Sequence, residues 1–427
     1  MSNRRPIRKR EAQQIIQALE GGIVPRMGLR HLLVGRQAQV REVADRLNRV
    51  EEGGSDLMIW VGDFGSGKSF MLGAIQQLAL QKNFVASTVD LSPSRRFQAS
   101  DGKGLALYQE IIRRLQSRTS GEGNALAHIL DAWMAELGED FDVVQEKIFA
   151  SVEDFQTGGL CYELGQALVA YASGMMEGNR DRKLQALRWL GGQIPTKTEA
   201  KQVLGISQII RDDNWTLFLQ NLAELFRVMG FAGFVVNFDE LVNLYKLPRT
   251  QSRDQNYERI LNLYNDLKSG AVPGLYVNLA ATRKTVFDER RGMASYGALK
   301  SRIGTEDPGL RDLVDTSSTL QILHPLTPEE IFTLLEKLQD VFLTLYPEGR
   351  ALSDGDIARY MQAQLNRPGA DEFLTPRAVI KDFLLLLQLT RQNPEVSAGD
   401  ILAKQFGRMG RVVRDRDDHD DDVIELL

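Results

Sequence analysis

The chain has 427 residues, 43% of them hydrophobic and 26% charged, a globular composition with room for two or three domains. Its formal net charge of −5 argues against coating nucleic acid through an overall field, although a local basic patch stays open. One cysteine excludes an internal disulfide, four histidines show no metal-ligand spacing, and no apolar run could span a bilayer. The sequence also has no signal-peptide pattern. We therefore expect a protein of the reducing cytoplasm that neither binds a membrane nor contains a structural metal.

The first 20 residues combine a basic arm with a predicted helix. A solvated, frayed terminus explains the arm better than contact with phosphate does. Further on, Val34, Gly35 and Arg36 directly precede a second predicted helix at 37–50. This V-G-R segment resembles the one that borders the adenine pocket in many AAA+ ATPases, and a plain turn before a helix is the alternative.

Residues 62–69 read Gly-Asp-Phe-Gly-Ser-Gly-Lys-Ser, between an apolar run at 57–61 and a helix predicted to begin near Lys68. This is the spacing of a P-loop, in which glycines let backbone N–H groups turn inward around an anion. Lys68 would reach the β- and γ-phosphates of ATP, and Ser69 would offer its hydroxyl to Mg²⁺. A ligand-free turn is the weaker alternative. The predicted nucleotide-binding residues here are Gly62, Asp63, Phe64, Gly65, Ser66, Gly67, Lys68, Ser69 and Phe70.

A β-α-β unit follows from the pattern after the loop. It comprises a helix to residue 81 and a β-branched strand over 84–91, and an amphipathic helix is predicted at 105–117. From 124 to 229 the pattern is almost wholly helical, far longer than an ordinary crossover, and predicts a helical insertion. Its tryptophans are better explained as core residues than as base-stacking platforms; they are Trp133, Trp189 and Trp215.

The next predicted strand, 234–238, runs into Asp239 and Glu240. Apolar residues that lead to an Asp-Glu pair are typical of a Walker B segment. Asp239 would hold Mg²⁺, directly or through water, because this ion prefers hard oxygen ligands. Glu240 would polarise the water that attacks the γ-phosphate. The alternative is a buried strand followed by an acidic helix cap.

A helix predicted at 256–268 precedes another strand at 273–282. Thr282 resembles the sensor 1 residue of AAA+ proteins, which orients the lytic water or contacts the γ-phosphate. Asn278 is the second choice. The β propensity of threonine is the competing explanation for Thr282.

Basic residues gather after this strand. Arg302, in the sequence Ser-Arg-Ile, resembles the arginine that an AAA+ subunit inserts into its neighbour's site. Arg290 and Arg291 stand behind it as alternatives for this arginine finger. A surface arginine is the competing explanation for Arg302.

The last core strand is predicted at 318–323, and Thr327 with Glu330 predicts a capping box. A bundle of helices is then predicted at 329–346, 353–364, 375–390 and 397–407. Arg377 lies in the first turn of the third of these helices, where a cation opposes the helix dipole unless an anion is near. It resembles the sensor 2 arginine of the origin-recognition and STAND branches of AAA+ proteins. The final residues form an acidic tail that predicts disorder.

Several segments together resemble the ATP-binding proteins of bacterial BREX phage-defence systems, of the shorter BrxD-like type. They are Gly22–Leu29, the V-G-R segment, the P-loop with its phenylalanine, Asp239–Lys246, Asn256–Ile260 and Leu374–Arg377. The resemblance spans most of residues 15–390. It implies an AAA+-like ATPase that acts against phage DNA beside a methyltransferase and a phosphatase-like partner.

The predicted fold is α/β, with a P-loop AAA+-like parallel sheet sandwiched by helices, a long helical insertion and a C-terminal helical lid. The predicted domains are an N-terminal arm and helix at 1–20, the ATPase core at 21–123 and 230–325, the insertion at 124–229, the lid at 326–411 and the tail at 412–427.

Two functions fit this pattern. The first is an oligomeric, Mg²⁺-dependent ATPase that remodels DNA or a partner protein of the defence system. Its catalytic residues would be Lys68, Glu240, Thr282, Arg302 and Arg377, with Ser69 and Asp239 on the metal. The second is a switch or loader that holds ATP and turns over rarely. A kinase is disfavoured, because no small-substrate signature accompanies the loop.

Overall fold

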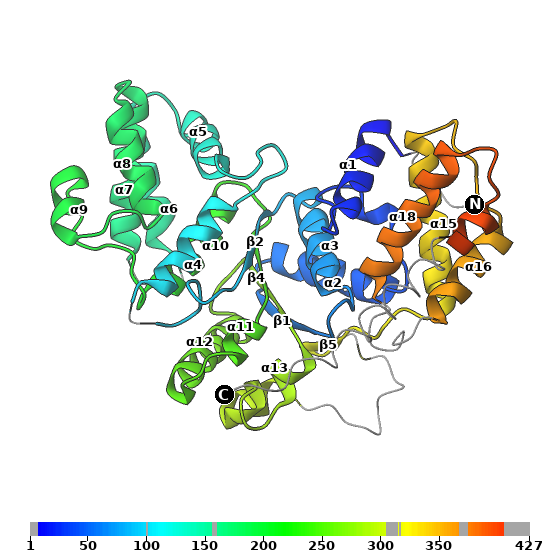
Figure 1. The fold of residues 1–427 in the computed structure, drawn as a ribbon. Helices are drawn as coiled ribbons and strands as arrows, with labels where there is room; N and C mark the ends of the chain where they lie inside the picture. Colours follow the sequence, from blue (N-terminus) through cyan, green and yellow to red (C-terminus); the bar gives the residue numbers. More distant parts are fainter. Residues whose placement is uncertain are drawn as a thin grey trace, which may run out of the picture. The chain divides into compact units, whose positions relative to one another are not determined.

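The computed structural model describes residues 7–99, 101–155, 160–304, 315, 317–366 and 375–404 (Figure 1). The predicted tail at 412–427 and Leu374 lie outside these residues. The chain divides into two compact units. The first comprises Met1–Gln37, Phe64–Gly67 and His324–Leu427, and the second comprises Ala38–Asp63 and Lys68–Leu323.

A five-stranded parallel sheet forms the centre of the second unit. Its order is β2 (Val85–Asp90), β3 (Phe234–Asp239), β4 (Leu275–Ala281), β1 (Asp56–Val61) and β5 (Leu320–Ile322). The three central strands are buried along their whole length, as expected when helices cover both faces of a parallel sheet. The predicted α/β class and its five core strands are therefore confirmed.

Alternate residues of the strands face two apolar layers. On one face, Met58, Trp60 and Tyr276 pack with α2 (Gln37–Glu51) and α3 (Lys68–Gln81). On the other face, strand residues such as Ile59 and Val236 pack with three further helices. These are α4 (Lys103–Arg113), α10 (Trp215–Val228) and α12 (Thr250–Lys268). Short elements follow α10 and β4: α11 (Val242–Tyr245), α13 (Arg283–Phe287), η2 (Met293–Ser295) and α14 (Gly297–Ile303).

Two predicted helices have different limits in the structure. α4 ends at Arg113 rather than at 117, because the backbone of Gln116 pairs with that of Ala86 through two hydrogen bonds of 2.8 and 2.9 Å. α12 begins at Thr250, six residues before the predicted start. The Arg253 guanidinium donates to the carbonyl of Leu247 at 2.8 Å and so fixes the turn that leads into this helix.

Five helices of the second unit lie between α4 and α10. They are α5 (Ala125–Leu137), α6 (Phe141–Glu153), α7 (Cys161–Met176), α8 (Arg180–Leu190) and α9 (Lys197–Leu204). Asp140, Asn179 and Thr196 cap α6, α8 and α9 with side-chain oxygens, which explains where the helical pattern is divided. The three tryptophans of this segment are 0 to 5% exposed, so their predicted core role is confirmed.

The first unit is helical in its described part. It contains α1 (Lys9–Glu20), η1 (Leu29–His31), α15 (Pro328–Leu345), α16 (Asp354–Leu365), α18 (Pro376–Gln392) and a helix at 398–404. α1 packs against α15 and α18. The predicted capping box at the start of α15 is confirmed: Thr327 and Glu330 exchange two backbone-to-side-chain hydrogen bonds of 2.9 and 3.2 Å.

Candidate functional site

The glycine-rich loop joins the end of β1 to the start of α3. The Gly62 N–H donates to the carbonyl of Ala281 at 3.1 Å, which ties the start of the loop to the end of β4. Gly65 and Gly67 adopt φ values of +81° and +92°. These left-handed conformations suit glycine and strain any residue with a Cβ. The sequence therefore places glycine where the loop adopts left-handed backbone conformations.

Lys68 and Ser69 form the first turn of α3. The Lys68 ammonium donates to the carbonyls of Gly62 and Asp63, both at 2.8 Å, so it folds back over the loop that precedes it. The Ser69 hydroxyl donates to the Asp239 carboxylate at 2.6 Å. Burial lowers the pKa of the Lys68 amine, and nearby carboxylates offset this only in part. The structure thus brings the predicted lysine, hydroxyl and carboxylate together.

Glu240 follows directly after β3 in a strained backbone conformation. Its φ is +60°, although it is not glycine, and its N–H donates to the Asp239 carboxylate at 2.8 Å. Burial, followed by the charges of Asp239 and Asp90, raises the pKa of the Glu240 carboxyl. Strained residues with perturbed pKa values are frequent at functional sites.

Asp90 is a further acidic residue that the sequence analysis did not select. It is the last residue of β2 and lies opposite Asp239 in the parallel pairing of β2 with β3. Desolvation and the Asp239 charge raise the pKa of Asp90, although its side chain reaches solvent. The available signal was an acidic residue at the carboxyl end of a predicted strand, the edge where parallel sheets hold ligands.

Thr282 lies directly after β4 and is buried. Its hydroxyl accepts a hydrogen bond from the Thr285 N–H at 3.3 Å and so caps α13. Asn278, the second choice, lies in the middle of β4, where its oxygen accepts a hydrogen bond from the Trp60 indole at 3.0 Å. Thr282 is therefore at the sheet edge that carries Gly62 and Asp239, and Asn278 is inside the sheet.

The three arginine-finger candidates differ in their contacts. The Arg291 guanidinium donates to the carbonyls of Tyr245 and Leu247 at 3.2 and 3.1 Å and lies over the Tyr245 ring. Arg302 is exposed at the end of α14, and its guanidinium binds none of the described residues. Arg290 is exposed as well. The Arg291 side chain is thus bound to the backbone of its own chain, whereas the Arg302 side chain contacts neither the loop nor the carboxylates among the described residues.

Residues predicted to border the nucleotide also occur in the first unit. Val34 and Arg36 are buried, and the Arg36 guanidinium donates to the carbonyls of Gly35 at 3.2 Å, Ser66 at 3.3 Å and His324. A Cβ on Gly35 would lie only 2.4 Å from the Glu330 carboxylate. Arg36 thus fixes the backbone of the loop at Ser66.

Arg377 is exposed in the first turn of α18, as predicted, and Thr375 caps this helix. A Cβ on Gly65 would lie 2.6 Å from the Thr375 side chain, so this glycine lets the loop approach the start of α18. Of the two phenylalanines near the loop, Phe64 is 71% exposed and Phe70 is half-buried.

The residues present fit a bound phosphate with its magnesium ion. The Ser66 hydroxyl is buried and lacks a hydrogen-bond partner among the described residues, and a Cβ on Gly67 would meet nothing within 4 Å. Ser69 and Asp239 would supply oxygen ligands to the ion. No group of three or more His, Cys, Asp or Glu residues positioned for a metal occurs in the described ranges. Mg²⁺ keeps several waters when bound and needs few protein ligands, and the Ser69 hydroxyl and the Asp239 carboxylate are oxygen donors of the kind that it prefers.

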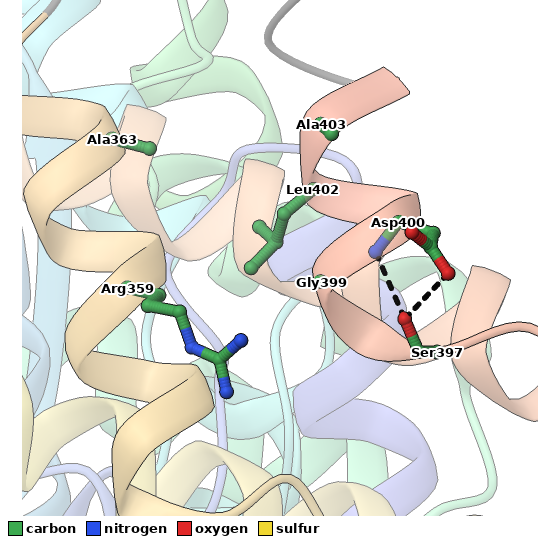
Figure 2. A pocket seen from close by; sticks show the side chains of 7 residues that line it. All are labelled: Arg359, Ala363, Ser397, Gly399, Asp400, Leu402 and Ala403. Carbon is green, nitrogen blue, oxygen red and sulfur yellow. Dashed lines mark hydrogen bonds between the residues drawn. The ribbon is translucent and has the colours of Figure 1, made fainter.

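A cavity of about 470 Å³ lies in the first unit between α16 and the helix at 398–404 (Figure 2). It is lined by Arg359, Ala363, Ser397, Gly399, Asp400, Leu402 and Ala403. The Ser397 hydroxyl donates to the Asp400 carboxylate and accepts from the Asp400 N–H, and the Arg359 guanidinium binds the Asp356 carboxylate at 3.1 Å. None of the predicted site residues lines this cavity.

Fold and site together define an α/β protein with a glycine-rich loop after the first strand of a parallel sheet and an acidic pair after the third. A family model described as BREX system ATP-binding protein BrxC/D matches residues 7–405. The chain therefore belongs to this family of ATP-binding proteins of the BREX phage-defence system, as the sequence segments predicted. Other components of the system are its partners. No curated protein matches the chain. In the part of the chain that the structure describes, no helix has both the length and the apolar character needed to cross a membrane.

Proposed function

We propose that the chain is a magnesium-dependent ATPase of the AAA+ type that works as a homo-oligomer on DNA or on a partner protein of the defence system. The observation that carries this proposal is the convergence of Lys68, Ser69, Asp239 and Glu240 at one edge of the sheet. Ser69 and Asp239 are 170 residues apart in sequence, and their side chains form a hydrogen bond of 2.6 Å.

The loop residues would bind and orient the triphosphate. Backbone N–H groups of the loop and the start of α3 would donate to phosphate oxygens. Lys68 would exchange the carbonyls of Gly62 and Asp63 for the β- and γ-phosphates. Ser69 and Asp239 would hold the magnesium ion, which neutralises charge on the phosphates when bound.

Glu240 would orient the attacking water and accept its proton. A raised pKa makes its carboxylate a stronger base than an ordinary glutamate. Thr282 would position the same water from the end of β4. Arg377, in a helical lid, would reach the γ-phosphate, and Arg302 would stabilise the transition-state charge in a neighbouring subunit.

The test is the steady-state ATPase rate of the wild type and of Glu240→Gln, over a range of protein concentration, with and without duplex DNA. We expect Glu240→Gln to lower turnover by about 10²- to 10⁴-fold while ATP still binds. Glu258→Gln changes an exposed glutamate of α12 and is the matched control, expected to leave the rate unchanged.

A rate per subunit that rises with protein concentration would support a site completed by a neighbouring copy. A wild type that retains ATP tightly and does not turn over would overturn the ATPase proposal. That result would identify the second function, an ATP-gated switch or loader.

A further inference from the structure

A row of polar side chains crosses the centre of the sheet. Asn237 of β3 is paired in register with Thr88 of β2 on one side and with Asn278 of β4 on the other. Both asparagines are fully buried. Asparagine is rare inside strands, and burying its amide costs free energy unless the amide groups find hydrogen-bond partners. Hydrophobic packing alone therefore does not account for this row.

The row lies on the face of the sheet that α3 covers. Val235 of β3 and Tyr276 of β4 belong to the apolar layer that packs with α3, and alternate residues of a strand share a face. Asn237 lies two residues after Val235 and two before Asp239, so these three side chains point to the same side of β3. The buried amide and the carboxylate of the site are therefore neighbours on one face of one strand.

Asn237 binds α3 directly. Its Nδ2 group donates to the carbonyl of Leu72 at 3.2 Å and to the hydroxyl of Thr88 at 3.0 Å. The Thr88 hydroxyl in turn donates to the side-chain oxygen of Gln76, one turn further along α3. A single buried amide thus connects β3 with β2 and with two successive turns of α3.

Two polar contacts therefore join β3 to α3, one behind the other. At the sheet edge the Ser69 hydroxyl donates to the Asp239 carboxylate at 2.6 Å. About one turn further into the helix, the Leu72 carbonyl accepts from Asn237. This carbonyl also accepts the backbone N–H four residues on, so Asn237 uses its second lone pair and leaves the helix intact. The inner contact holds the helix against the strand directly behind the outer one.

Stability alone would not select asparagine at position 237. The Asn237 Oδ1 atom is buried and has no hydrogen-bond partner among the described residues, and the same is true of the Asn278 Nδ2 atom. Unsatisfied buried polar atoms destabilise a fold. Valine would avoid this cost, because it is apolar and suits a strand. What asparagine provides, and valine cannot, is the hydrogen bond to the Leu72 carbonyl.

We propose that Asn237 is a positioning residue for the magnesium site, which sets the spacing of α3 and β3 at which Ser69 and Asp239 can hold one ion. The metal would take one ligand from each element, so its affinity depends on their spacing. The triphosphate would instead contact the loop and the first turn of α3, which are continuous in the chain. This inference rests on the proposed function, because it takes Ser69 and Asp239 as the metal ligands.

The experiment compares two substitutions on the same face of β3 in the full-length chain. Asn237→Val removes the hydrogen bonds to α3 and to Thr88. Val235→Ala is the matched control, because it removes apolar packing from the same layer and no side-chain hydrogen bond. The melting temperature is measured without nucleotide, and the binding of a fluorescent ATP analogue is titrated with Mg²⁺. Neither measurement needs hydrolysis, so failure of the positioning role and absence of ATPase activity can be told apart.

We expect Asn237→Val to melt within about 3 °C of the wild type, because it loses hydrogen bonds but also removes an unsatisfied buried oxygen. It should need about tenfold more Mg²⁺ for half-maximal binding of the analogue, as is typical when the support of a metal ligand is lost. Without Mg²⁺ its affinity for the analogue should equal that of the wild type. Val235→Ala should melt at least about 4 °C lower and need no more Mg²⁺ than the wild type.

Two further chains test the route of the effect. Thr88→Val keeps Asn237 but removes the hydroxyl that links it to Gln76, and it should raise the Mg²⁺ requirement at least about twofold. This variant decides the question if Asn237→Val does not fold. The double variant Ser69→Ala/Asn237→Val should bind Mg²⁺ no more weakly than Ser69→Ala alone, because Asn237 acts through the position of Ser69.

Several results would overturn the proposal. The first is a Mg²⁺ requirement that Asn237→Val and Thr88→Val leave unchanged. The second is the same rise in Val235→Ala, which would show a general loosening of the fold. The third is an additive effect in the double variant. A wild type that binds the analogue equally well with and without Mg²⁺ would overturn it together with the magnesium part of the proposed function.

Discussion

The carboxyl edge of the sheet and the helices α5 to α9 both carry many charged side chains, but they use them in opposite ways. At the sheet edge Lys68 binds backbone carbonyls, Asp239 accepts a hydrogen bond from Ser69, and burial shifts the pKa values of Lys68 and Glu240. On α5, α6, α8 and α9 charged side chains are exposed, as Asp142 and Arg180 are, or form ion pairs between helices at the surface, as Lys183 does with Asp131. A set of hydrogen-bonded residues with shifted pKa values is typical of a chemical site, whereas exposed charges and surface ion pairs are usually solvated and contribute little.

The largest expected effect tests this distinction within a single group of arginines. Arg302 is exposed and its guanidinium binds none of the described residues, whereas the Arg291 guanidinium binds two backbone carbonyls of its own chain. If Arg302 acts in trans, Arg302→Ala should lower ATP turnover by about 10³-fold with little change in melting temperature. Arg291→Ala should instead lower the melting temperature, because the Tyr245 carbonyl loses the Arg291 donor and the Leu247 carbonyl keeps only Arg253.

Steady-state turnover and thermal unfolding of both variants check this prediction, with Arg118→Ala as the exposed control. An active Arg302→Ala enzyme would remove Arg302 as the finger. If only Arg291→Ala lost turnover, and its stability did not change, the main role of Arg291 would not be its contacts with the two carbonyls.

The sequence predicted the sheet edge better than it predicted the use of charge elsewhere. Walker-type spacing locates Lys68, Ser69 and the acidic pair because each role requires one residue type at one position on a strand or helix end. The strands themselves follow from continuous apolar runs, which only a doubly covered sheet buries. These features are local, so one sequence suffices to find them.

Features that depend on partners distant in sequence were not predictable. Asp90 joins the carboxylate group only because β2 pairs with β3, and a single acidic residue after a strand is a common pattern. The positive φ of Glu240 and the contacts that occupy Arg291 likewise follow from packing.

The second prediction compares two glycines of the glycine-rich loop. Gly65 and Gly67 have similar φ values of +81° and +92°, so alanine strains the backbone at both. Only at Gly65 would the new Cβ collide with Thr375, at 2.6 Å. Gly65→Ala should therefore lower the free energy of unfolding by about 2–4 kcal/mol, and Gly67→Ala by about 1–2 kcal/mol.

Urea unfolding without nucleotide measures this difference, so that effects on phosphate binding do not enter. Equal losses for the two variants would mean that the contact between the loop and the start of α18 contributes nothing to stability.

The smallest expected effect concerns Glu110 of α4. Its carboxylate is nearly buried, like the groups at the sheet edge, but it is surrounded by cationic partners. Arg95, Arg113 and Arg114 all contact its carboxylate. Burial alone would raise the pKa of Glu110, but hydrogen bonds from Arg113 and Arg114 and the charge of Arg95 outweigh it, and the pKa lies below its usual value.

A lowered folded-state pKa means that the ionised form stabilises the fold above the usual carboxyl pKa and that this contribution is lost as the pH falls through the folded-state pKa. Glu110→Gln should therefore cost about 1–2 kcal/mol near neutral pH, because the three guanidinium groups lose a charged acceptor. In acid, where the wild-type carboxyl is itself protonated, the two proteins should converge in stability. Urea unfolding at both pH values, with Glu258→Gln as the exposed control, measures the difference. A loss of stability that is the same at both pH values would contradict this prediction. It would show that Glu110 stabilises the fold through packing and not through its charge.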